Sequence, residues 1–178
     1  MRLDHLITLE DLIGMRGNRR NRPTSNVITF GTFDLLHIGH LNILTKAKAS
    51  GRIWINSPGS PTPWGDPPNA TGWWGPEPTL IVGVSSDELN YNKKKKCPIL
   101  NQDDRMTIIG SLKMVDTVFL EESLELKREY IQRYNAEILV MGDDWKGKFD
   151  ELKDICDVVY LPRTPSISTT SIIEKIVN

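Results

Sequence analysis

Short apolar runs alternate with amphipathic segments along most of this chain. Apolar runs rich in β-branched residues predict five buried strands, at 27–30, 79–84, 118–120, 138–141 and 158–161. Apolar positions at helical spacing predict helices over about 40–50, 101–114, 124–134 and 168–177, the last with Ser168 as its N-cap. Strands that alternate with helices indicate an α/β fold, a Rossmann-like, doubly wound sheet of five parallel strands. Ligands of such sheets bind beyond the carboxyl ends of the strands.

Two segments depart from this alternation. Residues 1–25 contain a short amphipathic stretch followed by a basic linker, and we interpret them as an N-terminal appendage to a domain at 26–178. Residues 52–78 hold seven of the 11 prolines and four of the 5 tryptophans, a density that excludes a regular helix or central strand. We interpret 52–78 as a Pro/Trp-rich loop insertion that either folds onto the body or binds a partner. Since it joins a helix end to a strand start, we expect it at the amino ends of the strands, without a catalytic role.

Composition narrows the class of protein. The 178 residues suit one domain, and 22 Lys+Arg against 23 Asp+Glu exclude nucleic-acid binding through overall positive charge. No stretch approaches the ~20 apolar residues of a membrane span, and the N-terminus lacks a signal peptide's apolar core, so we expect a cytoplasmic protein. Cys97 and Cys156 form neither a disulfide framework nor a zinc cluster, and we interpret both as small buried hydrophobes.

The residues after the first strand carry the strongest chemical signal. They read GTFDLLHIGH, from Gly31 to His40, and lead directly into a predicted helix. Helix N-termini bind anions through free N–H groups, and Gly39 allows close approach of a phosphate. His37 and His40, spaced H-x-G-H, can donate hydrogen bonds to charge that develops on that phosphate. A core histidine or a two-ligand metal site is the alternative interpretation.

This segment resembles the signature G-x-F-D-x-x-H-x-G-H of the cytidylyltransferase family, in the nucleotidyltransferase superfamily. The segment RTPSISTT at 163–170 is similar to a second family signature, R-T-x-G-I-S-T-T. The segment MGDDWKGKFD at 141–150 and the strand VVYLP at 158–162 resemble the glycerol-3-phosphate cytidylyltransferases of bacterial wall teichoic acid synthesis. The resemblance covers about 26–177 apart from 52–78.

The resemblance implies an enzyme that uses CTP with Mg²⁺ and a small phosphorylated acceptor, glycerol 3-phosphate, to form CDP-glycerol. The acceptor phosphate attacks the α-phosphorus directly, pyrophosphate leaves and no covalent intermediate forms. A cytoplasmic homodimer is implied, with no nucleic-acid partner and no membrane span.

The resemblance also assigns roles to residues. It implies catalytic roles for His37, His40, Lys93 and Arg163, and acceptor contacts for Lys93 and Lys127. It implies nucleotide contacts for Thr32, Phe33, His37, Ile38, Gly39, His40, Lys95, Lys113, Asp144, Arg163, Thr164, Pro165, Ser166, Ile167, Ser168, Thr169 and Thr170. Asp34 is expected to organise the turn, although the family also suggests a link to the metal, and no metal-ligand set is assigned to the protein.

Several of these assignments have plainer alternatives. The lysine run 93–96 is equally typical of a solvated loop, and Lys127 of a surface helix charge. Asp144 and Trp145 either form a capping turn or lie beside the cytosine, with Trp145 shielding the pocket.

Two residues depart from the family pattern. Lys113 stands where the subfamily has an arginine. A lysine cannot form the bidentate hydrogen bonds to a phosphate that the planar guanidinium of arginine forms. Ser166 replaces a glycine, so a positive φ there would be strained.

Alternative functions also remain. Phosphocholine, phosphoethanolamine or a sugar phosphate could be the acceptor, and ATP could replace CTP. A nucleotide-binding interaction protein without catalysis is the alternative from another class.

Overall fold

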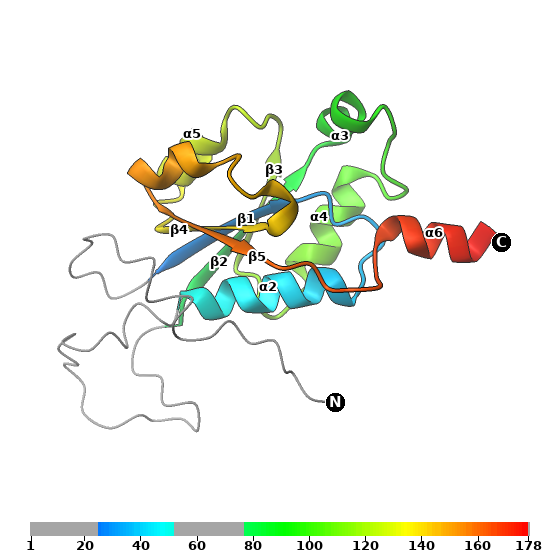
Figure 1. Ribbon diagram of the computed structural model, residues 1–178, viewed down its shortest axis with the longest axis horizontal. Coiled ribbons are helices and arrows are strands. Elements are labelled where there is room, and N and C mark those ends of the chain that lie inside the picture. The colour runs from blue at the N-terminus through cyan, green and yellow to red at the C-terminus, as the bar shows by residue number, and fades with distance from the viewer. Residues whose placement is uncertain (1–24, 52–76, 178) are drawn as a thin grey trace, which may run out of the picture.

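The computed structural model describes residues 25–51 and 77–177. Within these ranges five strands form one fully parallel sheet in the order β3-β2-β1-β4-β5 (Figure 1). The strands are β1 (Asn26–Gly31), β2 (Thr79–Ser85), β3 (Thr117–Glu121), β4 (Ile138–Gly142) and β5 (Asp157–Leu161). The Rossmann-like α/β fold predicted from the sequence is therefore confirmed.

In the same described ranges, four α-helices and two short 3₁₀ segments lie between the strands, and a fifth α-helix follows the last strand. They are α2 (Ile38–Ser50), α3 (Asp87–Lys94), α4 (Gln102–Gly110), α5 (Lys127–Arg133), α6 (Thr169–Val177), η1 (Asp143–Trp145) and η2 (Asp150–Asp154). The four helices expected from the sequence are present, although α4 ends at Gly110, short of the expected 114. The prediction of a loop for the lysine run 93–96 is wrong in part, because Lys93 and Lys94 form the last turn of α3. The Ser86 side chain caps this helix by accepting from the Leu89 N–H.

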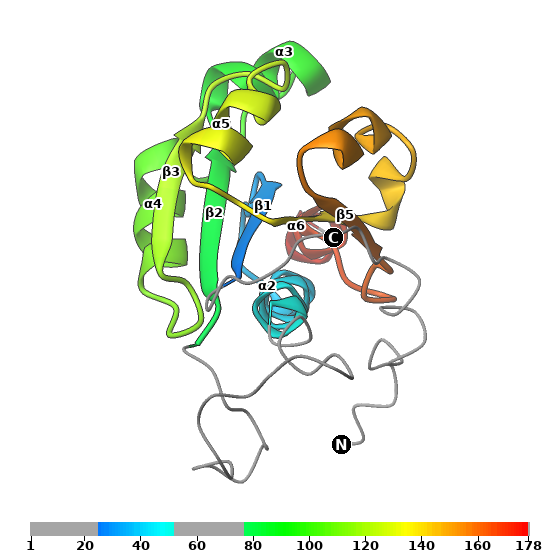
Figure 2. The ribbon, with the colours of Figure 1, turned by 90° about the vertical axis from the view of Figure 1, so that its left-hand side faces the viewer.

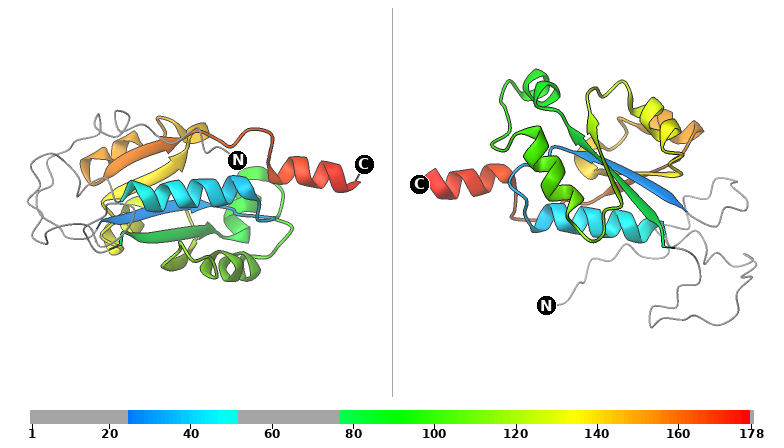
Figure 3. Two further views of the ribbon diagram at one scale, coloured as in Figure 1. Left: turned by 90° about the horizontal axis from the view of Figure 1, so that it is seen from below. Right: turned by 180° about the vertical axis from the view of Figure 1, so that it is seen from behind.

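Helices cover both faces of the sheet (Figure 2). Side chains alternate along β1, so Val27 packs on the face covered by α2 and α4, while Ile28 and Phe30 pack on the face covered by α5 and η2. Helix α6 extends away from the sheet (Figure 3) and has no buried residue. Cys156 is buried as expected, but Cys97 is exposed in the polar connection after α3, so its assignment to the core is wrong.

The topology defines where a ligand can bind. Order along the sheet reverses beside β1, since the chain continues from β1 to β2 and β3 on one side and then crosses to β4 and β5 on the other. Parallel sheets bind ligands beyond the carboxyl ends of the strands at such a reversal. Gly31, Ser85 and Gly142 end their strands at this edge, which is therefore the place to look for the site.

The predicted appendage at 1–25 and insertion at 52–78 lie almost wholly outside the described residues. Of the insertion only its end at 77–78 is described, and Pro78 packs against Gly51 where β2 is about to begin. This junction is at the amino ends of the strands, opposite Gly31 and Ser85. Across the described ranges, no helix combines the length and apolarity needed to cross a membrane.

Candidate active site

The loop from Gly31 to His40 joins β1 to the N-terminus of α2. His37 has extended backbone and is the N-cap of α2, and its Nδ1 accepts a hydrogen bond from the Gly39 N–H at 3.1 Å. A neutral imidazole that accepts at Nδ1 carries its proton on Nε2. His37 therefore has an Nε2–H available as a donor at a helix N-terminus, where free N–H groups favour an anion.

His40 stacks on His37, with ring centroids 3.8 Å apart, and lies edge-on to Phe33 at 5.4 Å. Burial, and secondarily repulsion from His37, lowers the pKa of His40 to about 4. Burial also lowers the pKa of His37. Both rings are thus neutral at pH 7 in the absence of ligand. Nδ1 of His40 is buried without a hydrogen-bond partner among the described residues, an arrangement that costs about 1–3 kcal/mol.

Gly39 provides the space in which the His37 imidazole lies. A Cβ at this position would lie 2.9 Å from Cε1 and 3.0 Å from Nδ1 of His37, closer than van der Waals contact allows. The same Cβ would lie 3.3 Å from Cγ2 of Ile167, in the 163–170 segment. Gly39 therefore allows both family-like segments to approach the start of α2.

The 163–170 segment is joined to the 31–40 loop by direct hydrogen bonds. Thr169 Oγ1 donates to the Asp34 carbonyl at 2.7 Å, and Asn42 Nδ2 donates to Thr164 Oγ1 at 3.0 Å. Ser168 caps α6, as expected, because its Oγ accepts from the Ser171 N–H at 3.0 Å. The hydroxyls and N–H groups at the start of α6 thereby face the same edge of the sheet as the histidine pair.

Four residues of this segment, Arg163, Pro165, Ser166 and Thr170, are exposed to solvent, and one of them is strained. Arg163 has a side chain that is 71% exposed and lies 3.9 Å from the Asp144 carboxylate. Pro165 is exposed, and Ser166 has φ 64°, the left-handed conformation in which a serine is strained. The departure from glycine at 166 is therefore accommodated with backbone strain.

Asp34 and Phe33 shape the turn. The two carboxylate oxygens of Asp34 accept from the N–H groups of Ile99 and Leu100, at 2.8 and 3.0 Å. These bonds fix the connection between α3 and α4 and assign Asp34 to the organisation of the turn. Phe33 adopts φ 53° and is buried in the core, whereas Ile38 is exposed beside the loop.

A group of charged residues lies at the ends of β2 and β3. Lys127 is only 2% exposed, so its interpretation as a surface charge is wrong. It pairs with the buried carboxylate of Glu121, which also accepts from Ser85 Oγ at 2.6 Å, and its Nζ lies 3.6 Å from the Phe30 ring centroid. Burial lowers the pKa of Lys127 to about 8, despite the opposing effect of Glu121.

Lys93 belongs to the same group. Burial lowers the pKa of Lys93, while Glu121 acts in the opposite direction. Its Nζ lies 5.8 Å from the Trp145 ring centroid, and Trp145 stacks on Phe149 with centroids 5.4 Å apart. Lys95 instead ends α3 with φ 54° and lies over the exposed Tyr91.

Asp144 folds back over the end of β4. A Cβ at Gly142 would lie 2.5 Å from Asp144 Oδ1, so this approach requires a glycine. η1 thus places Asp144 near Arg163 and Trp145 near Lys93.

Lys113 of this chain does not lie near the histidine pair. Lys113 is exposed in the connection after α4, shortly before Asp116, whose N–H donates to the Leu80 carbonyl near the start of β2. It therefore lies toward the amino ends of the strands, opposite the histidine pair.

Several buried polar residues at this edge were not expected from the sequence, among them three that link neighbouring segments. Arg105, Asn90 and Glu121 are at most 1% exposed and make hydrogen bonds with neighbouring segments. Only Arg105 carried a detectable signal, since it precedes the inward-facing Ile109 by four residues and so shares its face of α4.

A parallel sheet with a histidine pair and a hydroxyl-rich helix start at its carboxyl edge defines a class of protein, the α/β enzymes that bind and transfer nucleotides. The sequence model described as Cytidylyltransferase-like matches residues 28–64 and 75–175. The chain belongs to this family and is a nucleotidyltransferase.

Individual relatives cover nearly the whole domain. A glycerol-3-phosphate cytidylyltransferase of Bacillus subtilis is 42% identical over 150 residues, which are 84% of this chain and 95% of the relative. One of Staphylococcus aureus is 35% identical, over 84% of this chain and 93% of the relative. The crystal structure of a lipopolysaccharide core biosynthesis protein from Thermoplasma volcanium has a TM-score of 0.57 at 22% identity, over 79% of this chain and 98% of that one, and supports the fold alone.

Proposed function

We propose that this protein transfers a cytidylyl group from CTP to glycerol 3-phosphate and releases CDP-glycerol and pyrophosphate. The observation that carries the proposal is the 42% identity to a glycerol-3-phosphate cytidylyltransferase across 95% of that relative's length. The assembly of His37, His40, Lys93 and the 163–170 segment at one edge of the sheet supports the same conclusion.

The reaction we propose is a direct displacement. An oxygen of the acceptor phosphate forms a bond to the α-phosphorus of CTP, and the bond from that phosphorus to the β-phosphate oxygen breaks. The bond electrons leave with pyrophosphate, and no residue forms a covalent intermediate. Catalysis then consists of positioning and of stabilising the charge that develops on the phosphates.

The histidine pair supplies that stabilisation as neutral donors. His37 donates from Nε2 because its Nδ1 is occupied by the Gly39 N–H. Removal of one such donor typically costs about 2.7–4 kcal/mol of barrier. Arg163 and the hydroxyls of Ser168 and Thr170 hold the outer phosphates, while the Thr169 hydroxyl donates to the Asp34 carbonyl and fixes this segment against the 31–40 loop. Thr32, Asp144 and Lys95 are further nucleotide contacts.

The acceptor phosphate binds at the charged group formed by Lys93, Lys127 and Glu121. One carboxylate against two ammonium groups leaves the group one positive charge in excess while both lysines are protonated. Because this charged group is buried away from water, its positive charge attracts a phosphate dianion more strongly than it would in solvent. Trp145 lies beside Lys93, whose Nζ is 5.8 Å from the Trp145 ring centroid.

We propose that Mg²⁺ enters as the complex with CTP. In the described part of the chain, His, Cys, Asp and Glu side chains form no group of three that could hold a metal ion. Asp34 is occupied by two backbone N–H groups. The phosphate oxygens themselves are the hard ligands that Mg²⁺ prefers, and the ion neutralises charge on the leaving pyrophosphate.

The cellular setting that we propose follows from the substrates. CTP is an intracellular metabolite, so the enzyme acts in the cytoplasm, and its net charge of −1 gives nucleic acid no general attraction. The family resemblance supports a homodimer, which sedimentation would test.

Pyrophosphate release tests the proposal. CTP and Mg²⁺ are incubated with glycerol 3-phosphate, phosphocholine, phosphoethanolamine and a sugar phosphate, with ATP in parallel reactions. Release with CTP and glycerol 3-phosphate alone is expected. Pyrophosphate release with another acceptor would change the assigned acceptor substrate and leave the proposed mechanism unchanged. Nucleotide binding without any pyrophosphate release would favour a non-catalytic protein.

A further inference from the structure

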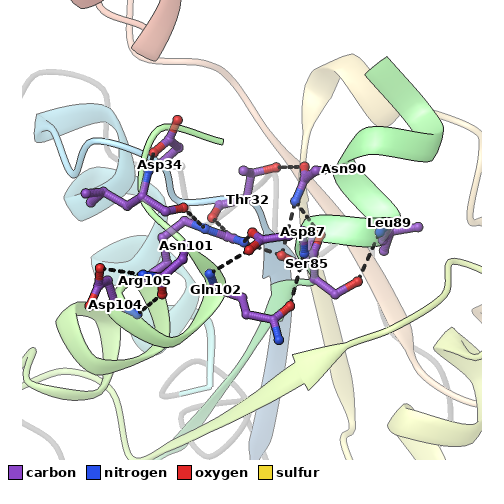
Figure 4. Close-up of polar contacts among 12 residues, drawn as sticks. Thr32, Asp34, Ser85, Asp87, Leu89, Asn90, Asn101, Gln102, Asp104 and Arg105 are labelled. Atoms are coloured by element: carbon purple, nitrogen blue, oxygen red, sulfur yellow. Dashed lines mark hydrogen bonds and ion pairs between the residues drawn. The ribbon is translucent and has the colours of Figure 1, made fainter. Parts of the chain in front are cut away.

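The helix that carries Lys93 is held against the nucleotide-binding loop by a buried polar network, which none of the assigned roles explains. Figure 4 shows the network between the 31–40 loop, the start of α3 and the start of α4. Its two central residues are Arg105, which is fully buried, and Asn90, which is 1% exposed. We call these two residues the brace.

Arg105 joins four segments with one planar guanidinium group. Nη1 donates to the carbonyls of Thr32 at 2.7 Å and Ser85 at 2.8 Å. Nε donates to the Leu100 carbonyl at 3.0 Å, and Nη2 pairs with Asp87 at 2.5 Å. A guanidinium has five donors in a fixed plane, so it can hold these segments in one geometry, which lysine cannot do.

Asn90 completes the link from the side of α3. Its Oδ1 accepts from Thr32 Oγ1 at 2.6 Å, and its Nδ2 donates to the carbonyls of Ser85 and Ser86. Residues three apart on a helix share a face, so Asn90 lies one turn before Lys93 on the same side of α3. The Thr32–Asn90 hydrogen bond therefore connects the nucleotide-binding loop to the face of the helix that carries the acceptor lysine.

We propose that the brace fixes the distance between the phosphates of the nucleotide and the acceptor phosphate, so that Arg105 and Asn90 are positioning residues for the transfer step. This inference rests on the proposed function, in which the 31–40 loop holds CTP and Lys93 holds the acceptor. A misplacement of about 1 Å between reacting groups can slow a reaction about a hundredfold. Loss of the brace should therefore slow transfer while each substrate still binds to its own element.

Asn90→Ala is the sharpest test because it removes the bond to Thr32 while both carbonyls that Asn90 bonds keep another donor. The Ser85 carbonyl keeps the Arg105 donor, and the Ser86 carbonyl keeps the backbone N–H of residue 90. Alanine also suits a helix interior. Asn92→Ala is the matched control, since Asn92 is exposed on the same helix.

We expect Asn90→Ala to lower kcat about 10–100-fold, with the Kd of CTP and the Kd of glycerol 3-phosphate each changed less than about threefold. The melting temperature should remain within a few degrees of the wild type. Asn92→Ala should match the wild type throughout. The proposed role of the brace would be overturned by unchanged turnover in Asn90→Ala or by an equal loss of turnover in Asn92→Ala. It would also be overturned if Asn90→Ala lost only substrate affinity.

A second pair of variants tests the hydrogen bond itself. Thr32→Val removes the hydroxyl that donates to Asn90 and should lower kcat at least to the level of Asn90→Ala, whereas Thr32→Ser, which keeps that hydroxyl, should lower kcat less than Thr32→Val does. The double variant Thr32→Val/Asn90→Ala should be no slower than Thr32→Val alone, because both substitutions remove the same hydrogen bond between the two side chains. Multiplicative losses would contradict the proposal.

Failure of the proposed function would look different. Wild-type protein that releases no pyrophosphate with any acceptor would refute both proposals, since there would be no transfer step to align. An active wild type with an equally active Asn90→Ala variant would refute the brace alone.

Discussion

Gly39→Ala places a single methyl group against the histidine pair and tests the proposed geometry. The new Cβ would lie 2.9 Å from His37 Cε1 and 3.3 Å from Ile167 Cγ2. The 2.9 Å contact forces the imidazole to move, and the 3.3 Å contact requires the 163–170 segment to shift by a few tenths of an ångström. Gly39 N–H also donates to His37 Nδ1, and movement of the ring weakens the bond that fixes its tautomer.

The expected magnitude follows from the loss of one donor to the phosphates. Such a loss costs about 2.7–4 kcal/mol, which corresponds to a decrease in kcat of about 100–1000-fold. Alanine is favoured over glycine in a helix by about 1 kcal/mol, and this gain offsets part of the steric cost. The free energy of unfolding should therefore change far less than the activation barrier.

Pyrophosphate release with CTP and glycerol 3-phosphate measures the effect, with a melting temperature for each variant. Gly110→Ala is the matched control, because its Cβ would lie 3.6 Å from Val118 Cγ2, an ordinary contact at the end of α4. It should keep full turnover. Wild-type kcat in Gly39→Ala would refute the reasoning, because the histidine geometry would then not matter to the reaction.

Three further predictions concern other charged groups of the site. Burial lowers the pKa of His40 from 6.5 to about 4. Between these pH values the unfolded chain therefore binds more protons than the folded protein. The free energy of unfolding should fall by on the order of 2 kcal/mol as the pH falls from 6.5 to 4. Denaturant titrations should detect this fall, and His40→Gln should remove most of it, leaving the smaller part that comes from His37. Since the pKa of Lys127 is about 8, kcat/KM for glycerol 3-phosphate should decline above that pH. In Lys127→Met, kcat/KM should be low at every pH and should not decline near pH 8. A wild-type kcat/KM that stays constant up to pH 10 would contradict the acceptor role of Lys127. Arg163→Ala should raise the KM for CTP about 10–100-fold with an unchanged melting temperature, because its side chain is 71% exposed; a normal CTP response would remove that role.

Local signals were sufficient to predict much of the fold. Each strand is a contiguous apolar run, and the order of strands and helices implied a parallel sheet before any contact was known. The H-x-G-H spacing placed two imidazoles at a helix N-terminus, where the structure stacks them. The strain at Ser166 was also foreseeable, because a glycine pattern at that position implied a positive φ.

The charged groups of the site could not be placed from the sequence. Lys127 reads as a surface charge, and only the tertiary fold supplies Glu121 and the Phe30 ring that make its burial possible. Helix α3 was missed because its few apolar residues show no helical pattern, and the fold instead buries Leu89 and Asn90 on one side. The partners that give Arg105 and Asn90 their role, the Thr32 carbonyl and the Thr32 hydroxyl, lie far away in the sequence and are brought close only by the fold.

Formation of labelled CDP-glycerol from labelled glycerol 3-phosphate, CTP and Mg²⁺ measures the proposed transfer itself. We expect the wild type to form one CDP-glycerol and one pyrophosphate per CTP consumed. His37→Ala and His40→Ala should each lower this rate about a hundredfold or more while the fold is retained. Labelled product at the wild-type rate in either variant, or none with the wild type, would contradict the account.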